Sequence, residues 1–292
     1  MIDIDAAPTT ILFATDGTSA SNHARGAAAH LARTSQAALH IVHVWAPTTT
    51  LSGARGVDEE IASGVAGAEA KLIEEALGYP VAGIHTPYGS RAHGILATAG
   101  AVGAGLIVVG GRRLGIVEEL FTYRVSEDVV HRSFRPVLLV REDGDEWPPR
   151  HIAVGCDGSP EAARALALSG WIARLSDADL VLVAVVDADA PNAEDAARDA
   201  GSALEISAAS ARPPGGTTMV TTRVVTATDV PKALRDVCTS LAGPRLLAIG
   251  ARGSSALHRV PEFSVSRSVT HHTQLPLLLV PPTSVKTGDL RS

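Results

Sequence analysis

The stretch from Leu246 to Val280, LLAIGARGSSALHRVPEFSVSRSVTHHTQLPLLLV, decides the fold class and the candidate site of this chain. It opens with a short apolar run that ends at Gly250, and it closes with a second apolar run that begins at Leu275. Between the two runs, a turn of small residues leads into a loop and then into a helix near Ser264. Glycines directly after a strand let backbone N–H groups approach an anion, and the N-terminus of the next helix adds donors. The stretch is therefore typical of a phosphate-binding turn, with an ordinary serine-capped turn as the alternative.

The same layout occurs earlier in the chain, as LIVVGGRRLGIVEELFTYRVSEDVVHRSFRPVLLV over residues 106–140. The start of each half agrees as well, because ILFATDGT at 11–18 aligns with IAVGCDGS at 152–159. Landmarks that recur in one order at a nearly constant offset indicate an internal duplication. We therefore expect two domains, over residues 1–145 and 146–292, joined through the charged, proline-ended segment 141–150. The landmarks of the final stretches are Gly110, Pro136 and Val140 in one half and Gly250, Pro276 and Val280 in the other.

Strand and helix patterns alternate through both halves of the chain. The strands are short and apolar on both faces, which is typical of a parallel sheet covered by helices on both sides. The alternation predicts right-handed crossovers and an α/β, doubly wound sheet in each domain. We expect strands at 11–15, 38–45, 81–86, 105–110, 136–140, 151–156, 179–186, 219–226, 245–250 and 275–280. We expect helices at 19–34, 58–77, 90–103, 124–133, 160–175, 192–211, 229–242 and 264–273.

Composition narrows the class of protein. The 292 residues are enough for two domains with cores of their own, and the net charge of −6 argues against a general nucleic-acid binder. No apolar run approaches the ~20 residues needed to cross a bilayer. The start, MIDIDAAPTT, contains no basic region or apolar signal core, and the two cysteines, Cys156 and Cys238, fit a reducing compartment. We expect a cytoplasmic protein that binds neither nucleic acid nor membrane.

An Asp-Gly pair ends the first strand of each half, at Asp16-Gly17 and Asp157-Gly158. One interpretation is a local turn, in which the carboxylate accepts backbone hydrogen bonds and the glycine adopts a positive φ. The other is a ligand carboxylate, because ligands of open α/β sheets bind at the carboxyl ends of the strands where strand order reverses. The sequence leaves both interpretations open.

Taken together, these motifs resemble the universal stress protein family in its tandem form. Members open with a strand followed by Asp-Gly-Ser, carry a G-2x-G-9x-G(S/T) phosphate motif after the fourth strand, and end with a Pro-Val-Leu-Val-Val strand. The resemblance covers nearly all of residues 9–282. It implies a five-stranded parallel sheet in the order 3-2-1-4-5, with Asp157 and Gly250 at one crevice. The family contains members that bind ATP and members that do not.

In the C-terminal half, the resemblance implies an ATP site that departs from the family pattern. Phe263 replaces the third glycine of the motif, where its ring would crowd the phosphates, and Pro261 removes a backbone donor from the loop. We expect weak ATP binding, mainly in this half. The candidate residues are Asp157, Val185, Gly250, Arg252, Gly253, Ser264 and Ser266.

The N-terminal half resembles the same site in degenerate form. Gly110 survives, but Arg113, Tyr123 and Arg124 stand where the motif has its second glycine, its third glycine and its Ser/Thr. The arginine side chains bind phosphate by charge, fill the crevice, or pair with Glu118, Glu119 or Glu127. The candidate residues of this half are Asp16, Val44, Gly110 and Ser126.

Three functions are compatible with these observations. The first is a non-catalytic stress-response sensor or interaction module that binds an adenine nucleotide weakly. The second is a nucleotide-free scaffold, in which the final strands 136–140 and 276–280 pair as an intramolecular pseudo-dimer and chains associate further into a homo-oligomer. The third is a slow ATPase, although no general base is apparent near the phosphate motif. We expect no metal site, because His40 and His43 lack a cysteine or carboxylate at ligand spacing.

Overall fold

A computed structural model describes residues 7–18, 21–45, 55–111, 120–212, 217–251 and 265–282. At 55–58, 120–124 and 271–272 it describes the backbone alone. The chain divides into two compact units, of which the N-terminal domain comprises Pro8–Trp147 and the C-terminal domain begins at Pro148. This division falls within the charged segment 141–150.

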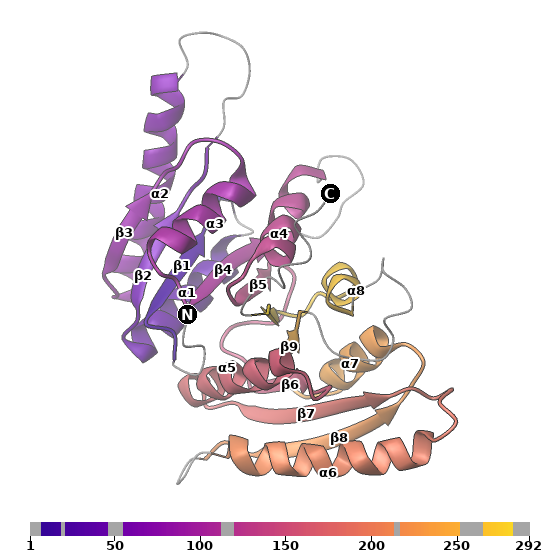
Figure 1. Ribbon diagram of the computed structural model, residues 1–292. Coiled ribbons are helices and arrows are strands. Elements are labelled where there is room, and N and C mark those ends of the chain that lie inside the picture. The colour runs from indigo at the N-terminus through magenta and orange to yellow at the C-terminus, as the bar shows by residue number, and fades with distance from the viewer. Residues whose placement is uncertain are drawn as a thin grey trace. The chain divides into compact units, whose positions relative to one another are not determined.

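The N-terminal domain alternates strands and helices throughout (Figure 1). All of its strand pairings run parallel, in the order β3-β2-β1-β4-β5. Strand order therefore reverses between β1 and β4, which lie side by side at the centre of the sheet. The strands are β1 (Thr10–Ala14), β2 (Ala38–Val42), β3 (Val81–His85), β4 (Leu106–Gly111) and β5 (Val137–Arg141), and the helices are α1 (Ser21–Ser35), α2 (Arg55–Leu77), α3 (Arg91–Ala101) and α4 (Leu120–Arg132).

The C-terminal domain repeats this plan. Its strands are also parallel, in the order β8-β7-β6-β9-β10, so the reversal lies between β6 and β9. The predicted fold class and the predicted order 3-2-1-4-5 are confirmed for both domains. The strands are β6 (His151–Gly155), β7 (Asp179–Val186), β8 (Val220–Thr226), β9 (Arg245–Gly250) and β10 (Leu277–Val280), and the helices are α5 (Pro160–Ser176), α6 (Ala193–Ala211), α7 (Val230–Thr239) and α8 (Val265–His272).

Helices pack in pairs on the sheet of each domain. In the N-terminal domain α1 contacts α2 and α3 contacts α4, while in the C-terminal domain α5 contacts α6 and α7 contacts α8. Right-handed crossovers place the members of one pair on one face, because the chain crosses the sheet in one direction before the reversal and in the other after it. Figure 1 shows α6 lying along β7 and β8.

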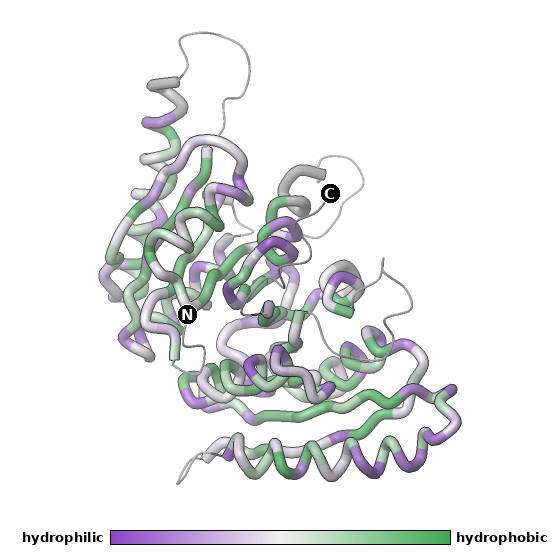
Figure 2. The backbone as a smooth tube through the Cα atoms, in the orientation of Figure 1, coloured by the Kyte–Doolittle hydropathy of each residue, from purple (hydrophilic) through white to green (hydrophobic). Residues whose placement is uncertain are grey.

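The central strands are hydrophobic along their whole length. Ile11, Leu12 and Phe13 of β1 are fully buried, as are Ile152 and Val154 of β6. In Figure 2, β7 is a nearly continuous hydrophobic stretch, whereas α6 alternates between hydrophobic and hydrophilic residues. This difference is expected for a strand covered on both faces and a helix covered on one.

Local chemistry explains where elements begin and end. The Ser159 hydroxyl caps α5 by accepting from the Ala162 N–H at 3.1 Å, and Pro160 supplies a favourable first helical residue. The second strand was predicted to continue to residue 45, but β2 ends at Val42. Beyond it, backbone hydrogen bonds still join the chain to the segment that follows β3, and Trp45 forms an isolated bridge with Tyr88.

The described ranges contain neither a candidate membrane span nor a candidate metal site. No helix there is long and apolar enough to cross a membrane. No group of three or more His, Cys, Asp or Glu side chains in those ranges is placed to hold a metal ion.

Candidate functional site

A pocket of about 120 Å³ lies in the N-terminal domain at the carboxyl ends of β1, β2 and β4. This is the edge where strand order reverses, so the pocket occupies the position expected for a ligand site in an open α/β sheet. Four residues predicted from the sequence, Asp16, Val44, Gly110 and Ser126, line it together. The other lining residues are Ala14, Thr15, Ser21, His43, Arg91, Ile95, Val109, Val125 and Val129.

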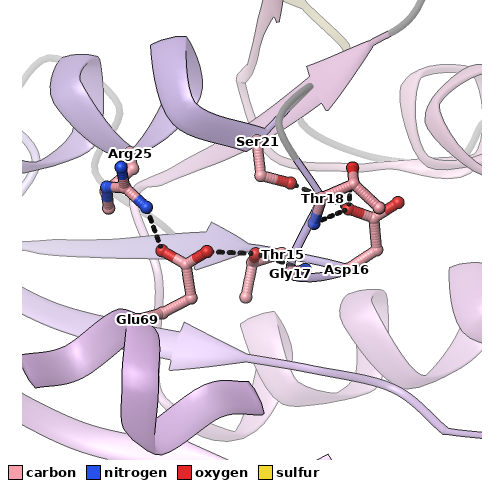
Figure 3. A network of polar contacts seen from close by, with 7 residues as sticks. All are labelled: Thr15, Asp16, Gly17, Thr18, Ser21, Arg25 and Glu69. Carbon is pink, nitrogen blue, oxygen red and sulfur yellow. Dashed lines mark hydrogen bonds and ion pairs between the residues drawn. The ribbon is translucent and has the colours of Figure 1, made fainter. Parts of the chain in front are cut away.

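The Asp16-Gly17 turn forms one polar side of this pocket (Figure 3). Asp16 Oδ1 accepts from the Thr18 backbone N–H at 3.0 Å, from the Thr18 hydroxyl at 2.6 Å and from the Ser21 hydroxyl at 3.0 Å. Gly17 has φ +75°, and a Cβ there would lie 2.6 Å from Val65 Cγ1. The glycine is therefore required both by its conformation and by close packing against α2. Asp16 Oδ1 therefore acts as the local-turn interpretation expected, as an acceptor of hydrogen bonds from nearby residues of the turn.

A largely buried ion pair between Arg25 and Glu69 lies beside the turn and reaches it through Thr15 (Figure 3). Glu69 of α2 is only 4% exposed, and its carboxylate lies 3.0 Å from Arg25 of α1. The other carboxylate oxygen accepts from the Thr15 hydroxyl at 3.2 Å, and that hydroxyl in turn accepts from the Gly17 N–H at 3.0 Å. A single carboxylate thus connects α1, α2 and the end of β1.

His43 and Ser126 bond to backbone carbonyls at the pocket wall. His43 Nδ1 lies 3.0 Å from the Thr15 carbonyl oxygen, and because a carbonyl only accepts, Nδ1 carries the proton. In the neutral ring Nε2 is then an acceptor. The Ser126 hydroxyl donates to the Gly110 carbonyl at 2.9 Å, so it ties α4 to the end of β4.

Sequence reasoning missed Arg91, Ser21 and Ile95 as pocket residues. Arg91 and Ile95 belong to α3, which begins after β3 at the same edge of the sheet. The signal was present, because a charged first residue of a helix that follows a strand lies at the carboxyl edge. Within the described part of the chain, no carboxylate forms an ion pair with Arg91.

The C-terminal domain contains the equivalent turn with different surroundings. Asp157 Oδ1 accepts from the Ser159 N–H at 3.0 Å, and Gly158 has φ +77°. A Cβ on Gly158 would meet nothing within 4 Å, in contrast to Gly17. Ser266 is buried and donates to the Ala251 carbonyl at 2.9 Å, so like Ser126 it ties a helix to the end of a strand.

Gly250, at the end of β9, is in close contact with the first turn of α5. A Cβ at this position would lie 2.7 Å from Glu161 Cβ and 2.9 Å from the Ala162 backbone nitrogen. The absence of a side chain therefore serves helix–strand packing, which is an alternative reason for this glycine. The predicted site residues Arg252, Gly253 and Ser264, together with Phe263, lie outside the described residues.

The two predicted adenine-contacting valines differ in their surroundings. Val44 is 7% exposed and lines the pocket, with its methyl groups next to Gly94 of α3. Val185 lies inside β7, paired in register with Val225 of β8. Val185 therefore takes part in strand pairing within β7, whereas Val44 lies beyond the end of β2.

Cys156 stands before Asp157, where the N-terminal domain has Thr15. The pKa of the Cys156 thiol is raised to about 12, mainly by burial and to a smaller degree by the neighbouring Asp157 carboxylate, while a backbone hydrogen bond with Val183 opposes the rise. Because the thiolate is the reactive form, this cysteine is inert near neutral pH.

Comparison with known proteins agrees with this architecture. The sequence profile of the universal stress protein family matches residues 8–141 and again residues 149–281. The chain belongs to the universal stress protein family. Each domain accounts for one copy of the family unit, as the internal duplication predicted.

Two relatives correspond to a single copy. Universal stress protein YxiE of Bacillus subtilis is 37% identical over 145 residues, which is 45% of this chain and 97% of the relative. A universal stress protein from Thermus aquaticus, named for its place in the QAH/OAS sulfhydrylase 3' region, is 38% identical over 138 residues, or 45% of this chain and 98% of the relative.

Among solved structures, a universal stress protein from Archaeoglobus fulgidus has a TM-score of 0.71 at 20% identity, over 93% of this chain and 97% of its own. That structure shares the two-domain fold.

Proposed function

We propose that this universal stress protein is a non-catalytic sensor or interaction module of the stress response, which binds an adenine nucleotide in its N-terminal pocket. One observation carries the proposal: the four site residues predicted from the family resemblance line one pocket at the point where strand order reverses. Apolar walls from Val44, Val125 and Val129 suit a nucleobase, and the polar side at Asp16 suits ribose hydroxyls.

The size of the pocket limits how much of a nucleotide it takes. Its volume of about 120 Å³ is below the roughly 300–1,000 Å³ of pockets that enclose drug-sized ligands. We therefore propose that it encloses one part of the ligand, either base or ribose, while the remainder extends outward.

The C-terminal domain is the weaker candidate in this proposal, although its glycine pattern is closer to the family motif. Gly250 already accommodates the first turn of α5, and the third motif glycine is Phe263. Any ATP binding there, through Asp157, Val185, Gly250, Arg252, Gly253, Ser264 and Ser266, is expected to be weaker than in the N-terminal pocket.

A nucleotide-free scaffold is the second candidate function. It is favoured by the internal hydrogen bonds of Asp16 Oδ1 and Ser126, which perform structural work without a ligand. Pairing of the final strands and homo-oligomer formation remain predictions. The third candidate is a slow ATPase. Cys156 does not support it, because its thiol is not a reactive nucleophile near neutral pH. Steady ATP turnover that disappears in Asp157→Ala would support this candidate.

Calorimetric titration with adenosine, AMP and ATP tests the proposed function. Val125→Phe fills the N-terminal pocket, and Val265→Phe makes the same change at the equivalent position, the first residue of α8. We expect Val125→Phe to weaken binding at least about 10-fold and Val265→Phe to leave it unchanged. The opposite result would move the site to the C-terminal domain. Failure of all three compounds to bind the unmodified protein would favour the scaffold.

A further inference from the structure

Arg91 lines the N-terminal pocket and belongs to α3, which is not part of the family's phosphate motif. It is the first residue of α3, it is exposed, and it lines the same pocket as Asp16 and His43. No carboxylate within the described ranges forms an ion pair with it. An arginine at the rim of a concave site, without a neutralising partner, is suited to an anionic group, because its planar fork matches phosphate and carboxylate oxygens.

The C-terminal domain lacks a charged residue at this position. Its α7 begins with Val230 where α3 begins with Arg91, so the cation is absent. The preceding residue is Asp229, whose carboxylate accepts from the Lys232 N–H at 2.8 Å and caps the helix. At the corresponding position of the N-terminal domain, Ser90 makes no side-chain cap. The first residue of this helix is therefore cationic in one domain and uncharged in the other, where a carboxylate precedes it.

The opposite side of the N-terminal pocket is less suited to an anion. Gly110 is the only residue of the three-glycine motif that the N-terminal half retains. Its carbonyl accepts from Ser126, so that hydroxyl is already committed as a donor. Asp16 adds a negative charge between the two ends of the pocket, which disfavours an anion on its own side.

We propose that Arg91 selects ligands that carry an anionic group and holds that group at the start of α3. Under the proposed function, which this inference extends, the ligand is a nucleoside monophosphate, whose single phosphate lies against Arg91 and whose apolar portion enters the pocket. A triphosphate gains little from its two further phosphates, because the motif glycines that would receive them are replaced in this domain.

Adenosine and AMP differ by one phosphate and form the probe pair. Calorimetry compares both compounds on the full chain, on Arg91→Ala, on Arg91→Lys and on Arg198→Ala, a control arginine that is 71% exposed on α6. We expect AMP to bind the unmodified chain more tightly than adenosine. Arg91→Ala should weaken AMP binding by about 10- to 100-fold and leave adenosine unchanged. Arg91→Lys should retain part of the preference, and Arg198→Ala all of it.

The outcomes separate this inference from the proposed function. If adenosine and AMP bind equally and Arg91→Ala changes neither, the role of Arg91 is wrong while nucleotide binding stands. If neither compound binds the unmodified chain, the proposed function fails, and titration with inorganic phosphate then decides about the anion site. Phosphate binding that is lost in Arg91→Ala would support that site, and its absence, or binding that persists in the variant, would overturn it.

Discussion

The two domains share one fold but differ in what lies beneath the Asp-Gly turn. In the N-terminal domain a buried carboxylate, Glu69, connects Arg25 and Thr15. In the aligned sequence of the C-terminal domain, Leu166 replaces Arg25 and Cys156 replaces Thr15. One copy thus stabilises the turn with desolvated charge, while the other has apolar or weakly polar side chains at the same positions. The fold tolerates either solution, so the ion pair is specific to the domain with the described pocket.

The largest expected effect comes from removing one partner of that ion pair. Glu69→Ala leaves Arg25, only 18% exposed at its side chain, without its counter-charge, and should destabilise the N-terminal domain by about 3 kcal/mol. Denaturant unfolding measures the loss. The double variant Arg25→Leu/Glu69→Leu imitates the apolar arrangement and should recover part of the stability. If the single variant were as stable as the unmodified chain, the ion pair would contribute nothing.

The next effect tests the packing of Gly250 on α5. A methyl group there meets backbone atoms of the helix, which move only if the whole helix shifts. Gly250→Ala should therefore destabilise the C-terminal domain by about 2 kcal/mol, as overpacking typically does. Thermal unfolding checks this result, with Gly170→Ala as the control, because its nearest contact is a flexible arginine end at 3.6 Å. Equal stability in both variants would contradict the packing role.

The paired turn glycines give a smaller and more direct comparison. Both have positive φ, so each alanine substitution should cost about 1 kcal/mol from backbone strain. Gly17→Ala should cost about 1 kcal/mol more than Gly158→Ala, because only its methyl group meets Val65. Unfolding free energies of the two variants measure the difference, and equal values would show that α2 adjusts without cost.

The smallest effect concerns pH. His40 Nδ1 lies 3.1 Å from His85 Nε2. Along the strands, His40 is paired in register with Gly83, and the equivalent pair in the C-terminal sheet is Val181 with Thr221. Burial, followed by the neighbouring His85, lowers the pKa of His40 below 6.5. The unfolded chain then binds the proton more readily, so the contribution of His40 is present above about pH 6.5 and is lost as pH falls through the lowered pKa.

Unfolding at pH 7.5 and pH 5.5 measures this dependence. His40→Asn should reduce the loss of stability between the two pH values, and Val181→Asn in the other domain should not alter it. An unchanged pH dependence in His40→Asn would exclude the histidine pair as its source.

The sequence was sufficient for the fold because its signals were local and repeated. Apolar runs such as Ile107–Val109, the Asp-Gly turns and the proline-led final strands recur in both halves, and each marks a strand end. Asp16, Val44, Gly110 and Ser126 were found through the family resemblance, which applies at strand ends and at the helix that follows. The site was less predictable where contacts span long sequence distances.

Arg91, Glu69 and Gly250 illustrate that limit. The contact of Glu69 with Thr15 joins residues 54 positions apart, and no periodicity indicates it. Gly250 belongs to a glycine motif, but its contact with Glu161 depends on how closely α5 approaches β9. Arg91 was overlooked because none of the motifs recognised in the sequence includes the start of its helix. Spacing alone does not reveal which helix end lies over which strand.

The carboxylate shared by α1, α2 and β1 has a consequence for ligand choice. Displacing the end of β1 would break the hydrogen bond from Thr15 to the largely buried Glu69 carboxylate, which opposes gradual reshaping of this wall. The N-terminal pocket should therefore bind molecules whose shape already complements its walls. Selection among ligands would then depend on shape complementarity and would not require a conformational change of the protein.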